Sequence, residues 1–295
     1  MDTFKLQHRG GKGVSGMSTK EEDAVAHIIT AQTHDHVLFF SNKGKVYMAR
    51  VWDIPAGSRT SKGKAIINML SLTEGERVTS MLPLTADMMA KKKGTAIVMC
   101  TAKGTIKKSS LEDFANIKSS GLIAIRLQGD DQLLWAHIAD STKNIMIATK
   151  HGKSIVFKES DVRVMGRATQ GVRAIDLEKD DIVTSMNIID PANKELAIFV
   201  LSEKGIGKKT KVSLFPIQRR GGKGVKIATV DGKTGPILFS GVVDDTKEAL
   251  LITSKQGQVV KITFDTIPLL SRVAKGVIVM RFTDKNETVS SATFV

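Results

Sequence analysis

A β-hairpin motif that recurs about every fifty residues is the feature that most constrains the fold of this chain. Each copy is an apolar run, a short polar turn with a glycine, and a second β-rich run, as in V-L-F-F-S-N-K-G-K-V-Y at 37–47. The other copies are T-A-I-V-M-C-T-A-K-G-T-I-K at 95–107, I-M-I-A-T-K-H-G-K-S-I at 145–155, L-A-I-F-V-L-S-E-K-G-I-G-K at 196–208 and A-L-L-I-T-S-K-Q-G-Q-V-V-K at 249–261. The turn glycines, Gly44, Gly104, Gly152, Gly205 and Gly257, are 60, 48, 53 and 52 residues apart. This period indicates a repeat architecture rather than two unrelated domains.

A second repeated segment, called the slot below, follows each hairpin. Its copies are S-R-T-S-K-G-K-A-I-I-N-M at 58–69, I-K-S-S-G-L-I-A-I at 117–125, G-R-A-T-Q-G-V-R-A-I at 166–175, Q-R-R-G-G-K-G-V-K-I at 218–227 and S-R-V-A-K-G-V-I-V-M at 271–280. The chain opens with a sixth slot, Q-H-R-G-G-K-G-V-S-G at 7–16, and then E-D-A-V-A-H-I-I, but no hairpin precedes them. We expect that this hairpin either lies upstream in a longer natural protein or has been removed.

The apolar runs are rich in β-branched residues and too short for stable helices, so they predict strands. Glycine in the turns suits the positive φ that tight hairpins require. About four strands per fifty residues form one propeller-type blade, and blades must stack around an axis to bury both faces. We therefore expect an all-β disc, a single domain over 1–295, with single helical turns at 110–115 and 158–162. The approximate repeats are 1–33 (partial), 34–90, 91–141, 142–192, 193–245 and 246–295.

The charge balance points to a polyanionic partner. Lysine and arginine number 44 against 30 acidic residues, which gives a net charge of +14. Such an excess in a folded domain favours nucleic acid, although lysine that merely maintains solubility is the alternative. Aromatic residues make up only 5% of the chain, and single-strand binders stack bases on aromatic side chains, so duplex DNA is the better candidate.

Other features place the chain in a reducing compartment. No apolar run reaches the length of about 18 residues that a membrane span needs, and the first residues lack the apolar centre of a signal peptide. We therefore expect a protein that is not exported and has no membrane partner. Cys100 is the single cysteine, which excludes an internal disulfide and suits the cytosol; we expect it to be a buried strand residue.

The repeat set, Q-H-R-G-G-K-G at 7–13 and A-Q-T-H-D-H-V-L-F-F-S-N-K-G-K-V-Y at 31–47 resemble the C-terminal domain of the bacterial DNA gyrase A protein. T-A-K-G-T-I-K-K-S, F-K-E-S-D-V-R-V-M-G and T-Q-G-V-R-A-I extend the resemblance over essentially the whole chain. The family's hallmark is a basic loop, Q-R-R-G-G-K-G, called the gyrase A box. It maps to Gln7, His8, Arg9, Gly10, Gly11, Lys12 and Gly13, with His8 in place of an arginine. The copy at 218–224 matches the motif more closely, but position favours the first copy.

The resemblance implies a six-bladed β-pinwheel whose neighbouring blades exchange strands. It implies a non-catalytic domain that wraps duplex DNA around its rim with positive handedness, so that the ATP-driven holoenzyme introduces negative supercoils. The implied partners are the breakage-reunion domain of the gyrase A protein and the gyrase B protein in an A2B2 enzyme, with ATP and Mg²⁺ used elsewhere and no cofactor in this domain. A bacterial, cytoplasmic, nucleoid-associated protein follows, with the isolated domain a monomer.

A box of glycine and cations suits the DNA backbone, because glycine lets backbone N–H groups approach phosphate. Bending duplex through half a turn over about 40 base pairs costs on the order of 10 kcal/mol. An exposed ion pair returns up to roughly 1 kcal/mol, so about a dozen contacts are needed and one box is too few. The recurring cations predict the remaining contacts on a basic rim: Lys43, Lys45, Arg59, Lys62, Lys103, Lys107, Lys118, Lys150, Lys153, Arg167, Arg173, Lys204, Lys208, Arg219, Arg220, Lys223, Lys255, Lys261, Arg272 and Lys275.

Several other motifs favour structural roles. G-K-G-V-S-G at 11–16 matches a dinucleotide fingerprint, but that motif needs a βαβ unit. His34 and His36 lack further metal ligands at suitable spacing, so we predict no metal. The paired aspartates at 130–131 and 180–181 are expected to be solvated.

Tyr47 is the only tyrosine and lies in a repeat strand without an acid cluster, so the DNA-cleaving tyrosine is expected outside this chain. The alternatives that stay open are the related domain of topoisomerase IV and a propeller scaffold that binds protein.

Overall fold

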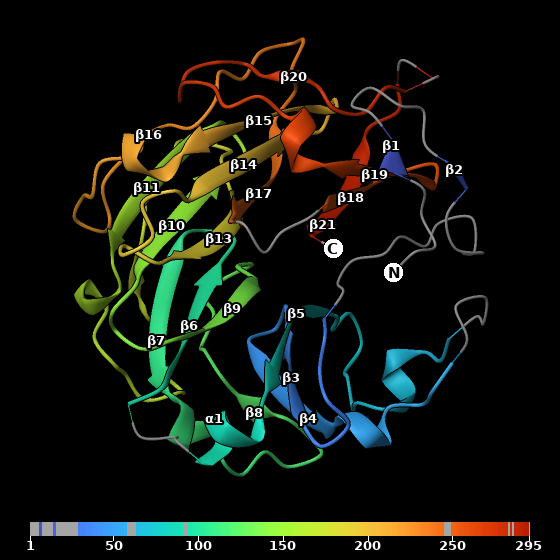
Figure 1. Ribbon diagram of the computed structural model, residues 1–295. Helices are drawn as coiled ribbons and strands as arrows, with labels where there is room; N and C mark the ends of the chain where they lie inside the picture. The colour runs from blue at the N-terminus through green and yellow to red at the C-terminus, as the bar shows by residue number, and fades with distance from the viewer. Residues whose placement is uncertain are drawn as a thin grey trace.

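The chain forms a ring of antiparallel β-sheets that follow one another in sequence order (Figure 1). The computed structural model describes residues 6–7, 14–15, 29–57, 63–90, 94–244, 249–282, 284 and 286–294. These residues form five sheets, and the inner strands of consecutive sheets contact one another around the ring. The expected all-β, propeller-like disc is confirmed.

Four of the sheets share one plan: an inner strand, the two strands of the hairpin, and a two-residue edge strand. The first sheet has the order β5 (Val78–Leu84), β3 (His36–Ser41), β4 (Lys45–Arg50) and β8 (Leu122–Ile123), and the second has the order β9 (Leu133–Ala139), β6 (Ala96–Thr101), β7 (Thr105–Ser110) and β12 (Val172–Arg173). The third sheet has the order β13 (Val183–Ile189), β10 (Asn144–Thr149), β11 (Lys153–Lys158) and β16 (Val225–Lys226). The fourth sheet has the order β17 (Ile237–Val243), β14 (Ala197–Ser202), β15 (Ile206–Lys211) and β20 (Val277–Ile278). In each sheet the edge strand belongs to the slot of the next repeat, which confirms the expected exchange of strands.

The last sheet receives its edge strands from the start of the chain. It consists of β21 (Val289–Phe294), β18 (Ala249–Ser254), β19 (Gln258–Thr263), β1 (Leu6–Gln7) and β2 (Val14–Ser15). Val14 pairs with Val259 just as Val225, after the second Gly-rich loop, pairs with Ser154. The sequence-based count of six blades is therefore wrong for the described part of the chain, which contains five. The opening segment has a slot but no hairpin of its own, and its strands join the last sheet.

The apolar cores lie between neighbouring sheets. Ile97 and Met99 of β6 pack towards the first sheet, whereas Val98 and Cys100 pack towards the third. Because both faces of these sheets are covered, β6 is buried along its whole length, as are β10, β14 and β18. This two-sided burial explains why the runs are continuously apolar rather than alternating. Cys100 is buried in the core as expected.

Helical structure is limited to short turns. They are α1 (Ala86–Ala90) and the 3₁₀ turns η1 (Val51–Asp53), η2 (Ile66–Asn68), η3 (Leu111–Phe114), η4 (Glu159–Asp161), η5 (Val212–Leu214) and η6 (Phe264–Thr266). The expected turns at 110–115 and 158–162 are confirmed by η3 and η4. Among the residues with described positions, no helix is long and apolar enough to cross a membrane.

Four hairpin glycines, Gly44, Gly104, Gly152 and Gly205, join their sheets to the following slot. Gly44 has φ +74°, and a Cβ added there would lie 2.5 Å from the carbonyl oxygen of Ile125. The Gly44 carbonyl accepts hydrogen bonds from the amides of Ala124 (2.9 Å) and Ile125 (3.1 Å). Gly205 has φ +73° and contacts Met280 in the same way. Glycine is therefore required for the positive φ, as expected, and also for close contact with the next repeat.

Candidate nucleic-acid interface

The slots place a loop on the outer edge of each of the first four sheets, where the edge strands lie in Figure 1. Each loop, called a rim loop below, runs from a 3₁₀ turn to the glycine before the edge strand. The described rim loops are 115–121, 163–171, 216–224 and 268–276. Three of them begin with a parallel bridge to the outer hairpin strand of the preceding sheet, at Lys108–Val164, Val156–Ile217 and Lys209–Leu269. A rim loop is therefore anchored at both ends to one sheet edge.

Consecutive rim loops are joined by hydrogen bonds. The Arg126 amide, just after one edge strand, donates to the Thr169 carbonyl in the next rim loop (3.0 Å). The Asp176 amide donates to the Gly222 carbonyl (2.9 Å) at the equivalent place. The third junction is closed by the Thr229 hydroxyl, which donates to the Val273 carbonyl (2.6 Å). The loops thus form a continuous band along the edge of the ring.

Two arginines are held in this band by backbone carbonyls. Arg220 donates from Nε to the Asp161 carbonyl and from Nη1 to the Arg173 carbonyl, both at 3.1 Å. Arg272 Nη1 donates to the Lys226 carbonyl at 3.0 Å, the equivalent position one repeat later. Each guanidinium has five N–H donors, so several stay available to an incoming anion.

The band carries eleven cations with exposed or partly exposed side chains. They are Lys118, Arg126, Arg163, Arg167, Arg173, Arg219, Arg220, Lys223, Lys226, Arg272 and Lys275. Eight of these were predicted from the sequence. Arg126, Arg163 and Lys226 were missed, although Lys226 occupies the same edge-strand position as Arg173 and could have been found by the same comparison of repeats.

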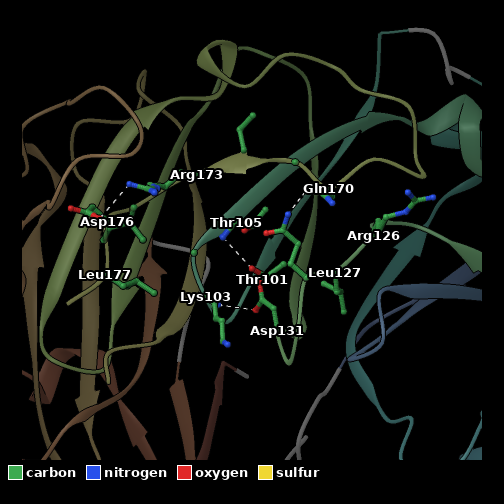
Figure 2. Close-up of a pocket in the computed structure, with 15 residues that line it drawn as sticks. Thr101, Lys103, Thr105, Arg126, Leu127, Asp131, Gln170, Arg173, Asp176 and Leu177 are labelled. Carbon is green, nitrogen blue, oxygen red and sulfur yellow. Dashed lines mark hydrogen bonds and ion pairs between the residues drawn. The ribbon is translucent and has the colours of Figure 1, made fainter. Parts of the chain in front are cut away.

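Two adjoining hollows lie where the segment after the edge strand of the first sheet meets the rim loop of the second sheet. One, of about 410 Å³, is lined by residues that include Arg126, Gln128, Gln170 and Arg173 (Figure 2). The other, of about 580 Å³, adds Arg163 to Arg126 and Gln170. Gln128 Nε2 donates to Gln170 Oε1 (2.7 Å) across the junction. This polar, arginine-rich lining suits the sugar-phosphate backbone better than an apolar ligand.

Acidic residues offset part of this charge. Asp176 lies 3.5 Å from Arg173, and Asp231 lies 2.5 Å from Lys275, which lowers the pKa of that carboxyl group. These pairs are exposed or partly exposed, so they are weak and can exchange for phosphate.

Comparison with known proteins identifies the family. The "DNA gyrase C-terminal domain, beta-propeller" family matches residues 1–32, 35–85, 95–140, 143–190, 197–237 and 248–295. The chain belongs to this family. The DNA gyrase A protein of Staphylococcus epidermidis is 36% identical over 284 residues, which cover 96% of this chain and 31% of that protein. The DNA gyrase A protein of Dehalogenimonas lykanthroporepellens is 38% identical over 301 residues, which cover 100% of this chain and 36% of that protein.

Solved structures agree with this assignment. A DNA gyrase A C-terminal domain superposes with a TM-score of 0.81 at 25% identity, covering 99% of this chain and 92% of that one. The C-terminal domain of a DNA topoisomerase IV has a TM-score of 0.78 at 24% identity, covering 89% and 80%, and shows the shared fold alone. The chain spans about a third of the length of the gyrase A proteins that it matches.

The gyrase A box itself is mostly outside the described residues. Gln7 lies in β1, and His8, Arg9, Gly10, Gly11, Lys12 and Gly13 are not described, nor are Arg59 and Lys62. Both flanks of the box are described, however. Leu6 pairs with Lys261 and Val14 with Val259, so the box joins two segments anchored to the edge of the last sheet.

Lys107 and Lys208, two of the predicted rim contacts, are buried instead. Their exposed fractions are 0% and 1%, and their ammonium groups donate to backbone carbonyls. Burial lowers the pKa of each to about 8. The prediction that these two lysines contact DNA from the rim is therefore wrong.

The lysines of the hairpin turns contact loops of their own repeats. Lys43 Nζ donates to the Thr73 hydroxyl at 3.2 Å. Lys103 forms an ion pair with Asp130, which lowers the pKa of that carboxyl group, and Figure 2 shows its side chain pointing away from Gln170. Lys204 Nζ donates to a backbone carbonyl of the loop at 231–235. Lys118, Lys150 and Lys255 are exposed or partly exposed, as are Lys45, Lys153 and Lys261 on the outer hairpin strands.

Tyr47 and His34, for which the sequence predicted structural roles, pack against other side chains. Tyr47 is 1% exposed, and its hydroxyl donates to the Glu76 carboxylate at 3.0 Å. Burial raises the pKa of Tyr47 to about 12. His34 packs edge-on against Trp52. Over the described ranges, no group of three His, Cys, Asp or Glu side chains is arranged to hold a metal ion.

The two aspartate pairs also organise turns. Asp131 accepts a hydrogen bond from the Lys103 amide at 2.9 Å, and Asp181 accepts one from the His151 amide at 2.9 Å. Both residues are equivalent members of their repeats, so their recurrence reflects turn geometry rather than acid–base chemistry.

Proposed function

We propose that this domain binds the backbone of duplex DNA along its band of rim loops and bends the DNA around the ring. The observation that carries the proposal is the continuous, hydrogen-bonded band with eleven cations on one edge of the molecule. Long, flexible cations and glycine-rich loops contact phosphates and do not read bases, so we expect little sequence preference.

Within the whole enzyme, the domain would wrap DNA with positive handedness and present a segment for strand passage. Gyrase would then introduce negative supercoils, using ATP and Mg²⁺ outside this domain, which needs no cofactor of its own. The partners we propose are the breakage-reunion domain of the gyrase A protein and the gyrase B protein in an A2B2 enzyme, on the nucleoid in the bacterial cytoplasm. We propose that the isolated domain is a non-catalytic monomer, with the cleavage tyrosine elsewhere in the enzyme.

We also propose a six-bladed pinwheel over one continuous domain, of which the described residues form five blades. Six segments of the chain match the family, but only five contain a hairpin. Among the described residues, the slot of the first complete repeat pairs with no sheet, and there Ile66 and Ile67 are 37% and 61% exposed. Their counterparts in the next repeat, Ala124 and Ile125, are buried under a hairpin glycine. A sixth hairpin would bury Ile66 and Ile67 in the same way.

A salt series on duplex binding tests the DNA proposal. Each neutralised phosphate contributes about −0.9 to the slope of log affinity against log salt. About ten contacts therefore predict a slope near −9 for the wild-type chain. The triple variant Arg126→Ala/Arg163→Ala/Arg167→Ala should make the slope less steep, reducing its magnitude by about 3. Lys179→Ala, in an acidic turn between Glu178 and Asp180, is the matched control and should leave it unchanged. A wild-type affinity that barely responds to salt would contradict the proposal.

The box should matter more for wrapping than for binding, because the rest of the band retains many cations. We expect Arg9→Ala/Lys12→Ala to reduce the linking-number shift of religated nicked circles while duplex affinity changes little. An unchanged linking-number shift in this variant would count against a special role for residues 7–13.

A further inference from the structure

Lys107 and Lys208 occupy equivalent positions on the outer hairpin strands β7 and β15. Fully buried lysines are rare in proteins unless their ammonium groups have partners. Here the partners are backbone carbonyls of slot residues, one in the lysine's own repeat and three in the next repeat. Lys107 Nζ donates to the carbonyls of Ala124 (2.8 Å) and Arg167, and Lys208 Nζ donates to those of Ser271 and Arg272, both at 2.6 Å.

The carbonyls identify what these lysines hold. Arg167 and Arg272 occupy the same position in their rim loops, four residues before the positive-φ glycines Gly171 and Gly276. Each lysine side chain therefore extends from the outer hairpin strand and fixes the backbone of the arginine in the rim loop of the next repeat.

Other repeats lack this contact. The equivalent residues are Tyr47 in β4, Ile155 in β11 and Val260 in β19. Ile155 lies beneath the second Gly-rich loop, where a Cβ added to Gly222 would be 3.7 Å from its Cδ1. That loop is instead held by a backbone contact with the preceding repeat, in which the Gly221 amide donates to the Ala174 carbonyl at 2.6 Å. The lysines therefore occur under rim loops that do not carry a Gly-rich box.

A hydrogen bond from a charged donor to a carbonyl group is strong. Because this bond already restricts the rim loop in the free protein, the loop does not have to lose the same conformational freedom when it binds DNA. A loop whose arginine backbone is already fixed loses less entropy when it binds phosphate. The buried position also prevents these ammonium groups from contacting DNA themselves.

We propose that Lys107 and Lys208 are positioning residues, each of which pre-organises the arginine of the next rim loop for the DNA backbone. The proposal rests on the DNA binding proposed above. It assigns these lysines a role in affinity that is exerted entirely through their arginines.

A double-mutant cycle on the full chain tests this coupling, with a 40-base-pair duplex of mixed sequence as the probe. We expect Arg167→Ala to weaken binding about fivefold, the equivalent of one exposed ion pair. Lys107→Met should weaken it by up to the same factor, and the double variant should bind no more weakly than Arg167→Ala alone. Ile155→Met is the control at the matched position and should bind as the wild type does. Additive losses in the double variant, or full affinity in Lys107→Met, would overturn the proposal.

Amide hydrogen exchange of the free protein provides a readout that does not depend on DNA. Lys107→Met should speed exchange in the loop at 163–171 and leave the loop at 268–276 unchanged, and Lys208→Met should do the reverse. Faster exchange throughout the chain would show that the lysine has only a global structural role. Unchanged exchange would show that the lysine does not restrict the rim loop. Either result overturns the proposal. If Lys107→Met does not fold, Lys107→Gln keeps a shorter neutral donor and should give the same local pattern.

The two arms separate this inference from the proposed function. If Arg167→Ala leaves duplex affinity unchanged while exchange responds locally, the premise of DNA contact at this loop fails and the role in affinity fails with it. If Arg167→Ala weakens binding and Lys107→Met does not, DNA binding stands and the positioning role is wrong.

Discussion

Gly205 is the position where a single methyl group should most damage the contact between repeats. In Gly205→Ala the new Cβ would overlap the Met280 carbonyl oxygen, on a backbone with φ +73°. The left-handed conformation costs alanine about 1–2 kcal/mol, and overpacking against a backbone atom adds roughly 1–3 kcal/mol. The carbonyl group of Gly205 accepts the amides of Val279 (2.8 Å) and Met280 (3.2 Å), so relief of the clash would strain these bonds.

Two further glycines calibrate the effect. Gly129→Ala is the control, since Gly129 has φ +57° with no described atom within 4 Å of the added Cβ, and it should cost only the backbone term of about 1–2 kcal/mol. Gly104→Ala should be intermediate, because its nearest neighbour is the Ile175 side chain at 3.0 Å, which can rotate. Urea unfolding followed by circular dichroism gives the three free energies of unfolding. If Gly205→Ala cost no more than Gly129→Ala, the hairpin glycines would not be required for contact between repeats.

Two predictions concern buried charge. Lys108 Nζ lies 3.3 Å from Glu159 Oε1 in a site where both side chains are nearly inaccessible to solvent. Lys108→Met should therefore lower the free energy of unfolding, measured in urea, by about 3–5 kcal/mol. A decrease below about 1 kcal/mol would contradict the pairing. The pKa values of Lys107 and Lys208 fall from 10.5 to about 8, so the folded chain binds fewer protons than the unfolded chain between about pH 8 and 10.5. The free energy of unfolding should gain up to about 3 kcal/mol per lysine as pH rises through this range. The gain is read as wild type minus Lys107→Met/Lys208→Met, because Cys100 and Tyr47 titrate in the opposite sense; a difference that does not change with pH would show that the two lysines are solvated.

Much of the fold could be predicted because the repeats are visible in local chemistry. Glycine marks each hairpin turn and an apolar run marks each buried strand, so both kinds of element could be predicted locally, and both are confirmed. The described residues form five sheets rather than the expected six because the slot and the hairpin of one repeat belong to different sheets. A slot at residues 7–16 therefore does not by itself indicate a further blade.

The site was harder to predict, because a lysine on a strand can face the solvent or the next repeat. Lys107 and Lys208 were assigned to the rim by their charge and by the recurrence of cations at the repeat period. Their counterparts Tyr47, Ile155 and Val260 are apolar or aromatic, and this comparison would have indicated a buried position. Two of the links between rim loops, from Arg126 to Thr169 and from Asp176 to Gly222, are backbone contacts that no side-chain pattern reveals.

The most direct test of DNA wrapping is the linking number of nicked circular DNA that is religated in the presence of this domain. We predict a positive linking-number shift that grows with protein concentration, and a smaller shift for Arg126→Ala/Arg163→Ala/Arg167→Ala than for Lys179→Ala. A negative shift, or none at concentrations that saturate the duplex, would contradict the claim that the rim loops hold DNA in a positive wrap.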